Sequence, residues 1–123
     1  MIVDALGNPL TFTLTAANVA DVSAAKSLIE KAPQMRTLIG DKGYDSDELI
    51  AWLKERGTQA LIPSRKNRLR QRPIDTHLYK ARNLVERAFN WLKHFRRIAT
   101  RFEKLDLHYA SMINVACLCK WLA

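Results

Sequence analysis

Cysteine is scarce in this chain, and long apolar runs are missing. Only Cys117 and Cys119 occur among the 123 residues, and their spacing inside an apolar helical stretch suits neither a zinc knuckle nor a redox pair. We therefore expect two buried thiols. No run approaches the roughly 18 apolar residues that a membrane span needs, and the N-terminus lacks the charged and then apolar pattern of a secretory signal. These absences predict a cytosolic protein.

Acidic residues are also few relative to basic ones. The chain has 20 Lys and Arg against 12 Asp and Glu, which gives a net charge of +8, and 48% of its residues are hydrophobic. It can therefore build a core and still attract a polyanion, which favours a nucleic-acid partner. Many unrelated basic proteins share such an excess, so the distribution of the charge matters more. The length suits one domain or a piece of one.

Glycine and proline number four each, and they mark the ends of the elements expected in the first half of the chain. Turn chemistry at Gly7-Asn8-Pro9 predicts a hairpin, and Pro33, Gly57 and Pro63 each end a regular run. The expected elements are strands over 2–6 and 10–15, a helix over 18–32, a strand over 36–40, a helix over 47–56 and a strand over 59–62. This order is typical of a mixed α/β sheet.

Two further expectations concern the ends of these elements. Ser46 or Asp45 is expected to cap the helix over 47–56, with Glu48 completing a capping box three residues after Asp45. The first strand begins directly at Met1, so we expect preceding sequence to be missing. The chain is then an N-terminally truncated domain.

The second half begins with a basic stretch and ends in two helices. Residues 64–73 hold five cations and almost no apolar side chain, which predicts a loop or flexible arm: Arg65, Lys66, Arg68, Arg70 and Arg72. Helices are expected over 78–102 and 107–122, the second with a buried stripe of Tyr109, Met112, Ile113, Ala116, Cys117 and Trp121. The predicted organisation is a sheet with the first helices over 1–63, a basic loop over 64–77 and two helices over 78–123.

One polar face of the helix expected over 78–102 stands out. At about 100° per residue, four polar side chains fall within an arc of roughly 60°: Tyr79, Arg82, Glu86 and Lys93. The apolar residues centre on the opposite side: Leu84, Ala88, Trp91, Leu92, Phe95 and Ile98. A solvated face with an i,i+4 pair between Arg82 and Glu86 is the alternative explanation.

The spacing Tyr79-x2-Arg82-x3-Glu86-x6-Lys93 resembles the Y-x2-R-x3-E-x6-K signature of DDE transposases of the insertion sequence four and five families. Residues 38–45 are similar to the segment that carries the second catalytic aspartate of that family. Residues 95–104 resemble the stretch after the signature, and residues 3–10 resemble the hairpin before the first helix. The resemblance covers essentially the whole chain and implies an RNase H-like fold.

The resemblance assigns roles to individual residues. Asp41 matches the second catalytic aspartate and Glu86 the catalytic glutamate, which would bind Mg²⁺ or Mn²⁺. No residue matches the first aspartate, so we expect the chain to be inactive alone. The expected contacts to DNA phosphates come from the helix face and the basic stretch: Tyr79, Arg82, Lys93, Arg65, Lys66, Arg68, Arg70, Arg72 and Arg97. By position alone, an ordinary turn aspartate before Gly43 is the more expected explanation of Asp41, and it is the resemblance that favours the functional role.

The implied function is metal-dependent cleavage and strand transfer at insertion-sequence ends. The implied partners are the DNA ends, the target DNA, the missing N-terminal part of the transposase and further copies in a multimer. Two alternatives remain: a basic DNA-binding module without catalysis, and a different RNase H-like nuclease. A third possibility concerns the gene, which could encode one part of a split or degraded transposase.

Overall fold

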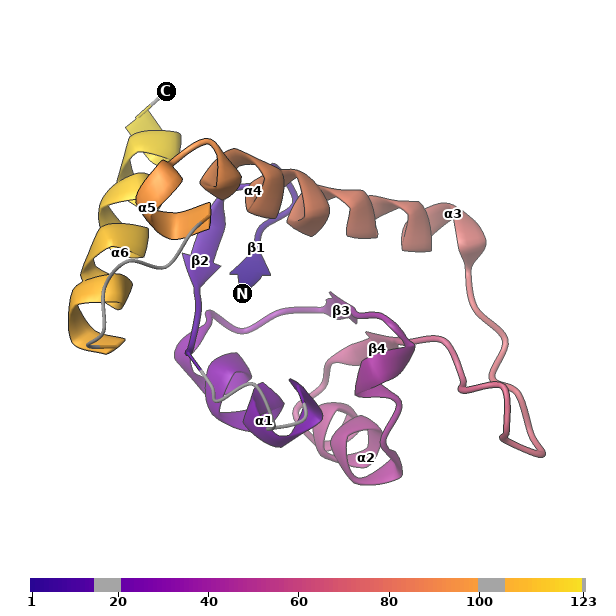
Figure 1. Cartoon of the computed structure of the whole chain (residues 1–123). Helices are drawn as coiled ribbons and strands as arrows, with labels where there is room; N and C mark the ends of the chain where they lie inside the picture. Colours follow the sequence, from indigo (N-terminus) through magenta and orange to yellow (C-terminus); the bar gives the residue numbers. More distant parts are fainter. Residues whose placement is uncertain (15–20, 100–105, 123) are drawn as a thin grey trace. The chain divides into compact units, whose positions relative to one another are not determined.

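The computed structural model describes residues 1–14, 21–99 and 106–122, which form two compact units (Figure 1). Unit 1 combines Met1–Leu14 with Asn83–Ala123, and unit 2 spans Thr15–Arg82. Both units mix helices with a small sheet, so the prediction of an α/β chain is confirmed. The described strands pair as two separate two-stranded sheets, whereas the strand order had suggested one mixed sheet.

Unit 1 begins with the predicted hairpin. Strands β1 (Ile2–Val3) and β2 (Pro9–Thr11) pair antiparallel, and both are shorter than expected. The Asp4 carboxylate limits β1 because its Oδ1 accepts hydrogen bonds from the backbone N–H groups of Leu6 and Asn8, each at 2.9 Å, so the chain turns directly after Val3. Gly7 completes the turn at a φ of 85°, a conformation that glycine adopts without a steric penalty. The predicted strand residue Thr15 lies outside the described residues.

In the described part of unit 1, the helices are α4 (Asn83–Lys93), α5 (Arg96–Ala99) and α6 (Asp106–Leu122). Their core is built around three buried residues, with eight partly buried neighbours: Leu92, Ile113 and Ala116, packed by Met1, Phe12, Leu14, Trp91, Phe95, Ile98, Tyr109 and Cys117. The Trp91 indole donates to the carbonyl of Ala116 at 3.4 Å, and the Tyr109 hydroxyl donates to that of Ile98 at 2.8 Å. The apolar faces predicted for both helices therefore meet each other.

The helix expected over 78–102 is not one continuous α-helix. It is divided into α3 (Thr76–Tyr79), the 3-10 turn η2 (Lys80–Arg82), α4 and α5, while residues 100–102 lie outside the described part. The α4 helix ends where the N–H groups of His94 and Phe95 bond back three residues instead of four. The Phe95 ring then packs edge-on against Trp91 at 5.8 Å between centroids, which keeps both rings in the core.

Two predictions about α6 need correction. Cys119 is exposed, and only Cys117 is partly buried, so the pair are not two buried thiols. Burial raises the pKa of the Cys117 thiol. Trp121 is 49% exposed instead of lying fully in the buried stripe, and its indole N–H donates to the carbonyl of Pro9 at 2.7 Å.

Unit 2 is organised around a parallel strand pair. Strands β3 (Thr37–Ile39) and β4 (Gln59–Leu61) pair in register from Thr37 with Gln59 to Ile39 with Leu61, and α2 (Asp47–Glu55) connects them as a crossover helix. Helix α1 (Asp21–Lys31) contacts α2, and the start predicted at residue 18 lies outside the described part. Seven apolar side chains of this unit are buried: Ala25, Leu28, Ile29, Leu49, Leu53, Leu61 and Ile62.

The start of α2 separates the two capping candidates. Ser46 is the cap, and its hydroxyl accepts from the backbone N–H of Leu49 at 3.3 Å. The third helical position is therefore Leu49, so the capping box expected between Asp45 and Glu48 does not form. Glu48 instead bonds Lys26 at 2.6 Å, and Asp45 turns inward.

Candidate functional site

Asp41 lies where β3 ends and the short 3-10 turn η1 (Lys42–Tyr44) begins. Its Oδ1 accepts a hydrogen bond from the backbone N–H of Gly43 at 2.9 Å. A Cβ at residue 43 would lie only 2.9 Å from this oxygen, so glycine is the residue that fits this close approach. The side chain remains 45% exposed. Asp41 therefore does stabilise the turn before Gly43, as its position suggested, and its carboxylate remains accessible to a ligand.

Arg82 lies beside Asp41 within unit 2. Its guanidinium Nη2 is 3.7 Å from Asp41 Oδ2, and its side chain is 32% exposed. Both Tyr79 and Arg82 follow the Asp75 cap of α3, whose Oδ1 accepts from the N–H groups of His77 and Leu78. Unit 2 thus brings together two of the predicted site residues, one acidic and one basic.

Glu86 and Lys93 belong to α4 in unit 1, and both side chains are exposed. They are seven residues apart, which places them on one face of the helix, while Ala88 and Leu92 are buried on another. Lys93 occupies the last turn, where a cation interacts favourably with the helix dipole. The division of α4 into a polar and an apolar face is confirmed.

The basic stretch over 64–73 forms a loop, as expected, but three of its arginines make defined contacts. Arg68 Nε and Arg72 Nη2 each bind the Asp45 carboxylate at 2.6 Å. The Arg65 backbone N–H donates to the same carboxylate at 2.7 Å, and its guanidinium reaches the carbonyls of Lys42 and Gly43 at 3.3 and 3.4 Å. This part of the basic stretch is therefore anchored to unit 2.

Lys66 and Arg70 are exposed on the same loop. Arg97 lies in α5, but its side chain is outside what the structure describes. Of the eight residues expected to contact DNA whose side chains the structure describes, Arg68 and Arg72 have their charge paired with a buried acid.

Asp45 is the residue that the sequence reasoning missed. Its side chain has no exposed surface, and burial by itself raises the pKa of the carboxyl. Hydrogen bonds from Arg68, the Arg65 backbone and Arg72 outweigh burial and lower the pKa from 3.8 to about 2. The available signal for this role was that residues 64–73 contain no acid, so any intrachain partner of these arginines had to come from elsewhere in the chain.

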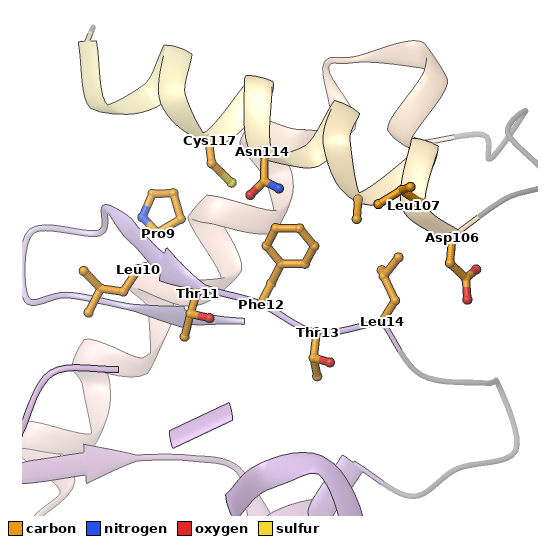
Figure 2. Close-up of a pocket in the computed structure, with 11 residues that line it drawn as sticks. Pro9, Leu10, Thr11, Phe12, Thr13, Leu14, Asp106, Leu107, Asn114 and Cys117 are labelled. Carbon is orange, nitrogen blue, oxygen red and sulfur yellow. The ribbon is translucent and has the colours of Figure 1, made fainter. Parts of the chain in front are cut away.

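In residues 1–14, 21–99 and 106–122, no group of three or more His, Cys, Asp or Glu side chains could hold a metal ion. An open pocket lies beside β2 and α6, where Phe12 points toward α6 (Figure 2). None of the residues that line it belongs to the predicted site: Pro9, Leu10, Thr11, Phe12, Thr13, Leu14, Asp106, Leu107, Ala110, Asn114 and Cys117. The described helices also include none long and apolar enough to cross a membrane.

Comparison with known proteins identifies similar sequences along nearly the whole chain. A family model described as a transposase DDE domain matches residues 1–119. A putative transposase for insertion sequence element IS402 of Burkholderia cepacia is 37% identical over 133 aligned positions, covering 98% of this chain and 61% of that protein. A putative transposase for insertion sequence element IS6501 of Brucella ovis is 35% identical over 122 positions, covering 98% of this chain and 94% of that protein. No solved structure matches the chain.

Proposed function

The chain belongs to the transposase DDE domain family, and from this premise we propose that it takes part in DNA transposition, by cleavage and strand transfer at the ends of an insertion sequence. The observation that carries the proposal is the half-exposed Asp41 carboxylate at the carboxyl end of β3, the end at which α/β sheets usually bind ligands. The chain spans 61% of the IS402 relative, so the activity and partners of a whole transposase are part of the proposal. An RNase H-like fold is part of it as well.

Asp41 and Glu86 are the residues that we propose as ligands of Mg²⁺ or Mn²⁺. Carboxylate oxygens are the hard ligands that these ions prefer, and both side chains are open to solvent. Such ions, when bound, activate a water or a 3′-hydroxyl and stabilise the leaving oxygen of a phosphodiester. The pair does not complete a family centre of three carboxylates. The proposal therefore includes that residues 1–123 are inactive until another segment or chain supplies a further acid.

The basic side chains are proposed to hold the DNA. Arg82 is near enough to Asp41 to bind a phosphate at the reacting centre, and its guanidinium can donate two hydrogen bonds to that phosphate. Lys93 would add a point charge on the face of α4 that carries Glu86, while Tyr79 would add a hydroxyl. Transposition also requires two DNA ends in one complex, so a multimer of the whole protein is expected.

Metal binding can be tested without any catalytic activity. Fe²⁺ replaces Mg²⁺ at oxygen sites and, with ascorbate and peroxide, cuts the polypeptide close to where it binds. We expect cuts near residues 41 and 86 that excess Mg²⁺ suppresses and that both Asp41→Asn and Glu86→Gln reduce. Asp47→Asn is the matched control, because Asp47 is an acid of the same unit with a side chain 85% exposed. Cleavage at other positions, or cleavage that is as strong in Asp41→Asn as in wild type, would refute the metal assignment.

A non-catalytic DNA-binding module is the second candidate. The observation that favours it is the Asp41 to Arg82 ion pair, since a carboxylate with a cationic neighbour is already partly neutralised. In that case Arg82→Ala would weaken DNA binding, while Mg²⁺ would bind neither Asp41 nor Glu86. Because the chain belongs to a family of transposases, we place this candidate and any other RNase H-like nuclease second.

A further inference from the structure

The basic loop, residues 64–73, is held in one conformation although it contains no helix or strand. The Gln71 amide donates to the carbonyls of Arg65 and Arg68, both at 2.9 Å. The Arg72 backbone N–H donates to the Ser64 hydroxyl at 2.8 Å, and the Arg72 guanidinium reaches the carbonyl of Ile62 at 3.1 Å. Together with the bonds to Asp45, these contacts brace the loop from inside.

The bracing divides the side chains of the loop into two sets. Arg65, Arg68 and Arg72 contact the body of unit 2. Lys66 and Arg70 are exposed, and between them Leu69 is fully exposed, at 103% of its reference surface. A leucine with all its apolar surface in water, flanked by cations on a braced loop, is a feature that the core of unit 2 does not explain.

We infer that Leu69 is an apolar wedge that enters a base step of double-stranded DNA while Lys66 and Arg70 bind the flanking phosphates. The inference rests on the proposed function, because it takes DNA as the partner. Proteins that deform DNA insert apolar side chains between stacked bases and use nearby cations on the backbone, and flexible pyrimidine–purine steps open most easily. The expected ligand is therefore duplex DNA at such a step.

Charge identifies DNA rather than a protein as the partner. The loop carries five cations and no acid of its own. Among residues 1–14, 21–99 and 106–122, the carboxylates in ion pairs with this loop are Asp45, which binds Arg68 and Arg72, and Asp47, which binds Arg68. Neither of these acids pairs with Lys66 or Arg70. A partner that binds this part of the loop must therefore contact Leu69 with an apolar surface and place negative charge near Lys66 and Arg70. Duplex DNA meets both requirements, because phosphates flank each step between stacked bases.

Asp45 acts in this scheme as a positioning residue. A wedge must be rigid, because a flexible leucine would fold onto its own chain sooner than separate two stacked bases. The buried carboxylate holds Arg68 on one side of Leu69 and Arg72 three residues beyond it, so the tip cannot collapse. Asp45 does not itself touch the DNA.

The test uses the full 123-residue chain and a short duplex with 2-aminopurine at a TA step, whose fluorescence rises when the base unstacks. Wild type should raise the fluorescence on binding. Leu69→Ala should abolish the rise and weaken binding no more than about tenfold. The double variant Lys66→Ala/Arg70→Ala should reduce the slope of log affinity against log salt by about two, one for each phosphate lost. Leu6→Ala is the matched control, since Leu6 is 83% exposed in unit 1 without this cationic setting, and it should behave as wild type.

Each other outcome overturns a defined part of the inference. If Leu69→Ala keeps the fluorescence rise, the loop binds phosphate without a wedge. If Leu69→Ala changes the oligomeric state measured by light scattering and leaves the fluorescence intact, Leu69 contacts a protein instead. If both loop variants bind as wild type does, DNA contacts another surface, and the proposed function survives. If the wild-type chain binds no DNA at low salt, the proposed function itself fails.

Discussion

At the scale of single residues, Asp45 stands out among the residues that the structure describes. It is a carboxylate without exposed surface that satisfies two arginines and a backbone N–H at 2.6 to 2.7 Å. Charge-assisted bonds of this length are strong, and removal of one member leaves its partners without compensation. The residue that shapes the basic loop is therefore an acid outside that loop.

Asp45→Asn should lower the free energy of unfolding by about 2–3 kcal/mol, since Arg68 and Arg72 remain partly exposed and water replaces some of the lost interaction. Urea unfolding followed by circular dichroism measures the loss. Asp47→Asn is the control: Asp47 binds the same Arg68 at 2.8 Å, but its side chain is 85% exposed, so a much smaller effect is expected. Equal losses in the two variants would contradict the assigned role of Asp45.

The depressed pKa of Asp45 also predicts how stability depends on pH. The pKa is about 2 in the folded chain against 3.8 for the free group, so the folded state favours the ionised form. This stabilisation is complete above pH 3.8 and disappears as pH falls toward 2, an effect of about 2 kcal/mol. Stability measured from pH 5 to pH 2 should fall less steeply in Asp45→Asn than in wild type. Parallel curves would show that Asp45 does not titrate in this window.

At the scale of elements, α4 serves two purposes at once. Leu92 is buried against α6, whereas Glu86 and Lys93 are exposed on another face. The core contact therefore fixes the direction in which the proposed metal ligand points. The residues of α4 that hold it in place are separate from those proposed to act, so stability and function can be changed independently.

Leu92→Ala should destabilise unit 1 by about 2–5 kcal/mol, through lost apolar contact and the cavity left behind. Thermal unfolding followed by near-ultraviolet circular dichroism measures the loss, with Trp52→Phe and Trp121→Phe in both proteins so that the tryptophan signal comes from Trp91, which packs beside Leu92. Phe89→Ala on the same helix is the control, because Phe89 is 46% exposed and should shift the transition far less. A larger effect from Phe89→Ala would mean that the packing of α4 differs from the one described.

At the scale of the whole molecule, the net charge of +8 should dominate the encounter with DNA. If about four phosphates are neutralised, affinity should fall by roughly 100-fold between 50 and 200 mM salt, whatever the DNA sequence. Fluorescence polarisation with two unrelated duplexes measures both properties. Affinity that is unchanged by salt, or that depends strongly on the sequence of the duplex, would contradict binding through the phosphate backbone.

Most elements could be predicted from the sequence because they depend on short-range properties. The hairpin at Gly7, the helix ended by Gly57 and the apolar stripe through Ile113 follow from turn chemistry and periodicity, and all three are present. The lengths were less predictable. The Asp4 turn limits β1 to Ile2–Val3, and α4 ends at Lys93, after which the N–H groups of His94 and Phe95 bond back three residues. Neither end is marked by a glycine or a proline in the sequence.

The sequence by itself determined the family and the positive charge, because spacing and composition are properties of the chain. It also determined that Asp41 follows a strand, that Glu86 lies on a helix and that residues 64–73 form a loop. Only the tertiary structure decided which charges are paired. Asp45 lies 20 to 27 residues from the groups it binds, and such a contact depends on the path of the backbone between them. The pairing of the described strands in two separate sheets and the exposure of Leu69 also depend on the path of the backbone, so they too became known only from the tertiary structure.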